Sequence, residues 1–192
     1  MKSIHIVGMD PSLSNWGMVS GYLDLESGVL DLQKLKVLKP SQLEGKQVRT
    51  NVKDIHRAVQ LVDGALEVLE GADVICVEVP TGSQSASAMK GYGICIGVLA
   101  ALEQAGHSFI LVTPTQVKEV TGLGKKATKA AMIDWAYTTY PDAPWPKQTK
   151  KGVTSIVANT AEHMADAVAA IHAGVQTPEF KRLLPAFRRA AQ

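Results

Sequence analysis

The stretch DVICVEV at residues 73–79 is almost continuously apolar, and Pro80 follows it directly. Such a run is typical of a strand that is buried on both faces of a sheet. Residues 46–69 precede it, and there apolar side chains recur every three and four positions, as in an amphipathic helix. A helix that leads into a buried strand predicts a parallel crossover, and therefore an α/β fold.

Patterns on either side of this unit predict the rest of the fold. Residues 3–9 (SIHIVGM) predict a strand that ends at a turn signal, and residues 15–25 and 29–38 predict a hairpin extending the same sheet. We expect further helices at 85–104, 116–120, 128–140 and 160–173 (capped by Asn159 or Thr160), a strand at 107–112, a loop at 141–159 and a final amphipathic segment interrupted by Pro185. This order predicts a mixed β-sheet that starts as an antiparallel hairpin, continues with parallel strands and is flanked by helices. The expected domain covers residues 1–175, and a basic amphipathic tail covers 176–192.

Composition restricts the class of protein. With 192 residues, of which 46% are hydrophobic and 20% charged, the chain is typical of one globular domain, which excludes collagenous, mucin-like and disordered classes. Cys76 and Cys95 lie in apolar runs, so we expect buried free thiols rather than a disulfide or a zinc ribbon. We find no secretory pattern and no apolar stretch of bilayer-spanning length. We therefore expect a cytoplasmic location and no membrane partner.

Positive charge is concentrated in one part of the chain. The net charge is only +2, but residues 113–157 contain seven lysines and three acidic residues. Such a patch is suited to a polyanion, although a solvated surface explains the charge count equally well.

Three groups of acidic residues are candidates for chemistry. Glu78 ends the buried stretch, where its charge requires either a basic partner or a bound cation. Asp10 ends the first predicted strand, a position also common for a turn-capping aspartate. Residues 161–167 (AEHMADA) place Asp166 on a helix face with His163, three residues away, or Glu162, four residues away. Together these groups suit divalent cations with oxygen ligands, and two such ions about 3.5–4 Å apart support phosphodiester hydrolysis.

Three short motifs, in this order, resemble the RuvC-type Holliday junction resolvases of the ribonuclease H-like superfamily, particularly the compact phage-type members. The first is GMDPSLS at residues 8–14 followed by Gly17, the second is CVE at 76–78, and the third is HMADAVA at 163–169. The resemblance implies that Asp10, Glu78, His163 and Asp166 are the catalytic and metal-binding residues. It also implies two Mg²⁺ ions, with Mn²⁺ as a substitute that the imidazole favours. Glu162 is the adjacent alternative to His163.

The resemblance extends to DNA binding and assembly. It implies that Lys118 and Lys129 hold the DNA backbone, with Lys125 and Lys126 as further candidates and Thr128 as the cap of the following helix. The glycine-containing helix at 91–102 corresponds to the family's dimer interface, so a homodimer is expected. Members of this family often have an aromatic residue shortly after the acid of the second motif, where it can insert into the junction as a wedge. Residues 80–84 contain no aromatic residue. Substitutes for that wedge, by hypothesis, are Tyr92, Trp145 and the loop lysines Lys147, Lys150 and Lys151.

The function expected from these observations is metal-dependent endodeoxyribonuclease activity that resolves four-way DNA junctions by paired symmetric nicks. Alternatives are a related nuclease for other branched or replicative DNA, and a catalytically silent DNA-binding module of the same fold. An actin-like ATPase is disfavoured because the chain is short and has no glycine-rich nucleotide loop, so no nucleotide cofactor is expected.

Overall fold

A mixed five-stranded sheet forms the centre of the computed structural model, which describes residues 3–45, 47–150 and 152–190. The strand order is β3-β2-β1-β4-β5. The first three strands pair antiparallel, and β4 and β5 extend the sheet in parallel beside β1, which confirms the expected arrangement. The strands are β1 (Ser3–Asp10), β2 (Trp16–Asp24), β3 (Leu30–Leu38), β4 (Val74–Glu78) and β5 (Phe109–Val112).

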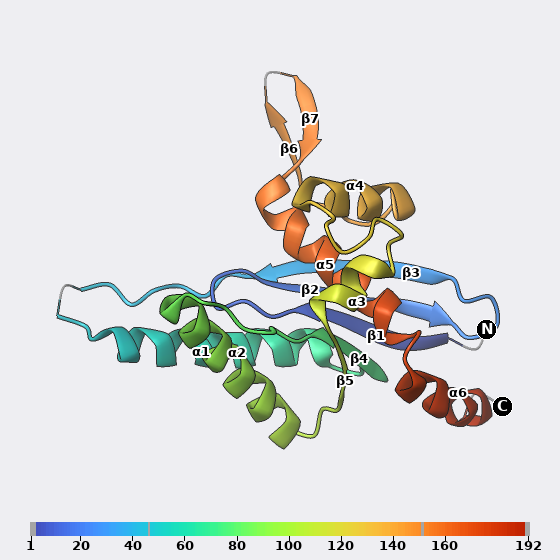
Figure 1. The fold of residues 1–192 in the computed structure, drawn as a ribbon, viewed down its shortest axis with the longest axis horizontal. Coiled ribbons are helices and arrows are strands. Elements are labelled where there is room, and N and C mark those ends of the chain that lie inside the picture. Colours follow the sequence, from blue (N-terminus) through green and yellow to red (C-terminus); the bar gives the residue numbers. More distant parts are fainter. Residues whose placement is uncertain (1–2, 46, 151, 191–192) are drawn as a thin grey trace.

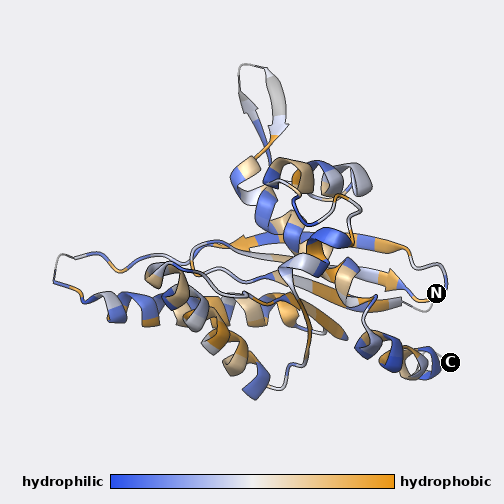
Figure 2. Cartoon of the chain, viewed as in Figure 1, coloured by the Kyte–Doolittle hydropathy of each residue, from blue (hydrophilic) through white to orange (hydrophobic). Residues whose placement is uncertain are grey.

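Helices cover both faces of the sheet (Figure 1). The helices α1 (Thr50–Leu69) and α2 (Ala86–Gln104) pack on one face. On the other face lie α3 (Pro114–Glu119), α4 (Lys129–Thr139) and α5 (Ala158–Gly174). The final helix, α6 (Pro178–Ala190), contacts this second layer through the buried ring of Phe180. Apolar residues are correspondingly concentrated along the strands and inner helix faces in Figure 2.

Glycines allow α5 to lie directly on the sheet. A Cβ atom at Gly8 would stand 2.0 Å from the backbone oxygen of Ala167, and one at Gly17 would stand 2.1 Å from that of His163. Any side chain at either position would therefore push α5 away from the sheet. The alanine-rich sequence of α5 completes this close contact, because residues such as Ala165 and Ala169 are fully buried.

Several expectations about local structure are confirmed. Cys76 and Cys95 are buried free thiols. Thr128 caps α4, because its hydroxyl oxygen accepts a hydrogen bond from the backbone N–H of Ala131. The expected helices at 116–120 and 128–140 are separate, and between them Gly122 and Gly124 adopt φ angles of 77° and 80°, which favour glycine.

The loop expected at 141–159 is wrong, because it contains the hairpin of β6 (Lys147–Lys150) and β7 (Val153–Ile156). The strands are short and polar, so they lack the apolar alternation by which a half-buried strand is recognised. Lys151 lies outside the described residues, as does Lys46 at the expected start of the first helix.

Two expectations about helix ends are also wrong. Helix α5 begins after Val157 with no side-chain cap, and the Thr160 hydroxyl donates to the Val157 carbonyl instead of capping the helix. Pro185 lies inside α6 without interrupting it. It is exposed, so water can reach the carbonyl that the missing N–H would have bonded.

Helix α2 contradicts the expectation that no apolar stretch is long enough to span a bilayer. By length and composition alone it could cross a membrane, which is weak evidence taken by itself. Only 22% of the segment is buried within the protein, so α2 presents a largely exposed apolar surface.

Candidate active site

The alternation of side chains along β1 directs Asp10 toward α5. Ile4 and Ile6 pack in the cluster beneath α5, whereas Val7 and Met9 pack on the opposite face with α1 and α2. Because side chains along a strand alternate between faces, Asp10 follows Ile4 and Ile6 to the α5 side.

Glu78 reaches the same place from β4. Val74 and Cys76 lie beneath α5, so Glu78 also points to that face. Met9 pairs with Val77 in the parallel register, which leaves Asp10 and Glu78 beside each other at the carboxyl ends of adjacent strands. Adjacent strands are about 4.8 Å apart, so the two carboxylates are close neighbours.

Helix α5 supplies the remaining groups. The Nδ1 atom of His163 lies 2.7 Å from Oδ2 of Asp10, a hydrogen bond that joins residues 153 positions apart. This bond is the main reason that the pKa of His163 is raised, and burial opposes it. Asp166 lies one turn further along the same helix.

The charges of these acidic groups act on one another. Burial raises the pKa of Glu78 to about 8, with further contributions from Asp10 and Asp166. Burial likewise raises the pKa of Asp166 to about 7, assisted by Asp10 and Glu162. Lys118 has a smaller opposing effect on both, which places its ammonium group near the acids. The residues expected to meet in space therefore do so, and their negative charge is incompletely compensated.

The chemical type of these ligands fits a divalent cation. Carboxylate oxygens from β1, β4 and α5 are the hard ligands that Mg²⁺ prefers. Across the part of the chain that the structure describes, no three His, Cys, Asp or Glu side chains are arranged to enclose an ion. Asp10 and His163 bind each other through one carboxylate oxygen and Nδ1.

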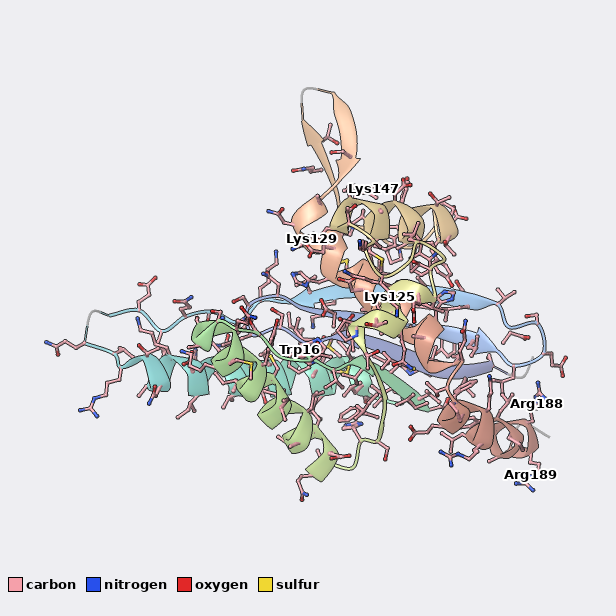
Figure 3. All side chains as sticks on the ribbon, viewed as in Figure 1. Trp16, Lys125, Lys129, Lys147, Arg188 and Arg189 are labelled. Carbon is pink, nitrogen blue, oxygen red and sulfur yellow. The ribbon has the colours of Figure 1, made fainter. Side chains whose placement is uncertain are left out.

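The predicted DNA-binding lysines differ in their contacts. Lys129 forms an ion pair of 2.6 Å with Glu162, which leaves His163 rather than Glu162 in contact with Asp10. Lys125 is exposed and lies 3.4 Å from Glu119 (Figure 3). Lys126 is exposed, and the DNA contacts of all four lysines stay predictions.

Sequence reasoning missed Arg57, which holds the loop after Asp10. Its guanidinium donates to the Leu13 carbonyl at 2.9 Å and to the Ser14 hydroxyl at 2.7 Å. It also lies 3.8 Å from Asp54, a buried acid that Lys90 contacts at 2.7 Å. The i,i+3 spacing of Asp54 and Arg57 on a helix was the available signal.

Two buried polar atoms beside this loop have no partner among the described residues: Nε of Arg57 and Nε1 of Trp16. Trp16 is fully buried at the start of β2, six residues after Asp10 (Figure 3). Such unpaired groups are uncommon in folded proteins and mark places where local geometry is constrained by its surroundings. The loop between Asp10 and Trp16 is therefore held by packing as well as by Arg57.

The hypothesis of a replacement wedge is wrong for Trp145. This ring is only 4% exposed, and its N–H donates to the Tyr140 carbonyl. Tyr92 is half-buried on α2 and stays a hypothesis. Lys147 and Lys150 belong to β6 rather than to a loop.

Comparison with known proteins gives a likeness of fold. No protein-family model and no curated protein matches the chain. Thermus thermophilus RuvC solved in complex with a Holliday junction substrate superposes with a TM-score of 0.60 at 18% identity, over 86% of this chain and 92% of that one. A second Thermus thermophilus RuvC structure gives a TM-score of 0.58 at 20% identity, over 88% and 96%. At this identity the likeness shows that the chain has a ribonuclease H-like fold.

Proposed function

We propose that this protein is a metal-dependent endodeoxyribonuclease that resolves four-way DNA junctions by paired nicks. One observation carries the proposal: Asp10, Glu78 and Asp166, from three separate elements, meet at one sheet edge, where the charge of Asp10 adds to burial in raising the pKa of both Glu78 and Asp166. The fold in common with a protein solved on a Holliday junction supports this substrate over other branched DNA.

Asp10, Glu78 and Asp166 would hold Mg²⁺ ions, with Mn²⁺ as a substitute. When bound, the metal supplies an activated water and stabilises the charge on the leaving oxygen. Glu78 and Asp166, whose pKa values of about 8 and 7 reflect burial and the charge of Asp10, become fully ionised once a cation compensates them. Lys118 reduces the same repulsion and is positioned to attract the DNA backbone.

His163 completes the site in this proposal. Its Nδ1 atom is engaged by Asp10, so Nε2 is the ring atom that can face an ion or the scissile phosphate. The hydrogen bond also fixes the orientation of the ring, because Asp10 lies on a central strand of the sheet. A raised pKa lets His163 keep a proton to higher pH, which suits protonation of the leaving oxygen.

We also propose that two copies associate through α1 and α2. An apolar groove of about 400 Å³ lies between these helices, lined by residues that include Ile55, Val59, Ile94 and Gly97. Ile55 is 65% exposed and Val59 is 53% exposed, which is unusual for neighbouring branched aliphatic residues. A two-fold dimer would present two sites to the two related strands of a junction.

Cleavage of synthetic DNA tests the catalytic proposal. Purified protein with Mg²⁺ or Mn²⁺ is incubated with a four-way junction, a fork, a flap and an RNA–DNA hybrid, all labelled at their 5′ ends. We expect symmetric nicks in the junction, whereas Asp10→Asn and Glu78→Gln should bind the junction without cutting it. Cleavage that survives both substitutions would refute the assignment. Binding without nicking under any divalent ion would instead identify a silent DNA-binding module.

Sedimentation tests the dimer separately. Val59→Asp places a charge on the exposed apolar surface and should convert a dimer to a monomer. Lys53→Asp, a half-buried position on the same helix outside the groove, is the matched control. A wild-type protein that sediments as a monomer at micromolar concentration would contradict the dimer.

A further inference from the structure

The β6–β7 hairpin stands apart from the rest of the molecule. Its two strands pair only with each other, and they project away from the sheet on the side of α4 and α5 (Figure 1). An isolated hairpin of this length has marginal stability in water. At its base, Ile156 is partly buried against the core. The projecting strands are joined to no other strand, so this part of the hairpin is placed to contact another molecule.

The hairpin is basic and polar. Between Ala143 and Ala161 the sequence contains three lysines and no acidic residue. The first of these, Lys147, is exposed at the start of β6, and no carboxylate forms an ion pair with it among the residues that the structure describes. Exposed lysines on an extended strand suit the phosphates of a nucleic acid backbone, which lysine contacts as a point charge.

The hairpin is joined directly to the helix that carries the candidate site. The backbone N–H of Val157 donates to the Pro146 carbonyl at 2.9 Å and closes the base of the hairpin. Helix α5 starts at the next residue and presents His163 within its second turn. From Val157 to His163 a helix rises about 9 Å, and the four residues from Val157 back to Val153 add about 13 Å. Val153, at the far end of β7, therefore lies no more than about 22 Å from His163.

Basic groups lie between the hairpin and the site. Lys129 begins α4 and contacts Glu162, the residue before His163. Figure 3 shows Lys147 and Lys129 on the same side of the sheet, whereas Arg188 and Arg189 lie at the opposite end on α6. A polyanion that extends from the acidic cluster on the α4 side would meet Lys129 first and Lys147 next. A DNA arm carries negative charge along its whole length, so it fits this arrangement better than an acidic protein does.

We propose that the β6–β7 hairpin binds the phosphate backbone of the duplex arm that leads away from the scissile phosphate. The inference rests on the proposed junction-cleaving function. A duplex rises about 3.4 Å per base pair, so the contact falls within about seven base pairs of the cut. The hairpin acts by charge and shape, so it adds affinity and orientation without sequence preference.

Equilibrium binding to junctions of different arm length tests the proposal. The variants are Lys147→Ala/Lys150→Ala in the hairpin and, as a control with the same charge loss, Lys181→Ala/Arg189→Ala on α6. Fluorescence anisotropy in EDTA gives Kd at several salt concentrations for arms from 4 to 20 base pairs. Thermal melts verify that each variant is folded.

We expect the hairpin variant to bind long-armed junctions about 3- to 10-fold more weakly, with the salt slope reduced by about 1 to 2. Wild-type affinity should fall when the arms are shorter than about seven base pairs, and the hairpin variant should not respond to that shortening. If the wild type binds and cuts junctions but the hairpin variant matches the α6 control in Kd and salt slope, the hairpin proposal alone is refuted. If the wild type binds no junction, the proposed function fails with it.

Discussion

Gly17→Ala tests whether close packing of α5 on the sheet creates the site. The new Cβ atom would stand 2.1 Å from the backbone oxygen of His163, whereas ordinary contact begins at 3.4 Å. The overlap of about 1.3 Å cannot be relieved by rotating a side chain, so α5 must move at His163 itself. Overpacking of this kind costs about 1–3 kcal/mol, and a backbone obstacle places Gly17→Ala at the upper end. For a chain of this size, 3 kcal/mol corresponds to a fall in Tm of roughly 6–12 °C.

The same displacement should impair chemistry beyond its effect on stability. A shift of about 1 Å in a positioned group costs roughly 100-fold in rate, so nicking by Gly17→Ala should fall by about that factor at a temperature where the variant is folded. The assays are thermal unfolding followed by circular dichroism and single-turnover cleavage of a junction. Gly93→Ala is the control, because it is exposed in α2 with nothing near its Cβ position. Helix propensity should make the control up to about 1 kcal/mol more stable. A Gly17→Ala protein that melts within 2 °C of wild type and cuts at the wild-type rate would refute the packing argument.

Three further predictions address the loop, the acids and the last helix. Arg57→Met should lower the nicking rate about 10-fold or more, and Arg57→Lys should recover little of it, because one ammonium cannot contact Asp54 and the loop at Leu13 and Ser14 at once, as the two Nη atoms of Arg57 do; equal rates for Met and wild type would contradict this. The folded pKa values of Glu78 and Asp166, about 8 and 7, exceed their ordinary values of 4.5 and 3.8, so the folded metal-free protein holds extra protons between these limits. The contribution of these two groups to stability should therefore be greatest below about pH 4 and fall as pH rises to 8; melts in EDTA should show Glu78→Gln a few degrees above wild type at pH 8, and a flat difference between pH 5 and 8 would exclude the effect. Pro185→Ala should raise helicity and stabilise α6, by up to the roughly 3 kcal/mol that separates proline from alanine inside a helix; a lower Tm would show that the proline is needed there.

The sequence predicted the sheet and the acids because both leave local patterns. The apolar run of residues 73–79 and the turn after Met9 fix where two strands end, and parallel strands end at a common edge. Asp10 and Glu78 could therefore be placed together before any coordinates. The spacing of α5 likewise offered Asp166 with His163 or Glu162, and the structure places His163 against Asp10.

Other features depend on contacts that no local pattern records. Arg57 looks like an ordinary polar position on α1 until α1 is packed beside the loop at Leu13, 44 residues earlier. The hairpin at 147–156 escaped prediction because its strand sequences, KQTK and VTSI, carry no alternation of apolar and polar residues. Burial of Trp145 was likewise invisible, because that residue stands between two prolines in a polar segment.

The hydrogen bond between Asp10 and His163 has a consequence for when the protein can work. Its two partners are 153 residues apart, so β1 is synthesised well before α5. A partly synthesised chain that ends before α5 holds Asp10 and Glu78 without His163 and Asp166. The proposed cutting activity would therefore arise only once α5 has been made and packed on the sheet, and shorter nascent chains would not cut DNA.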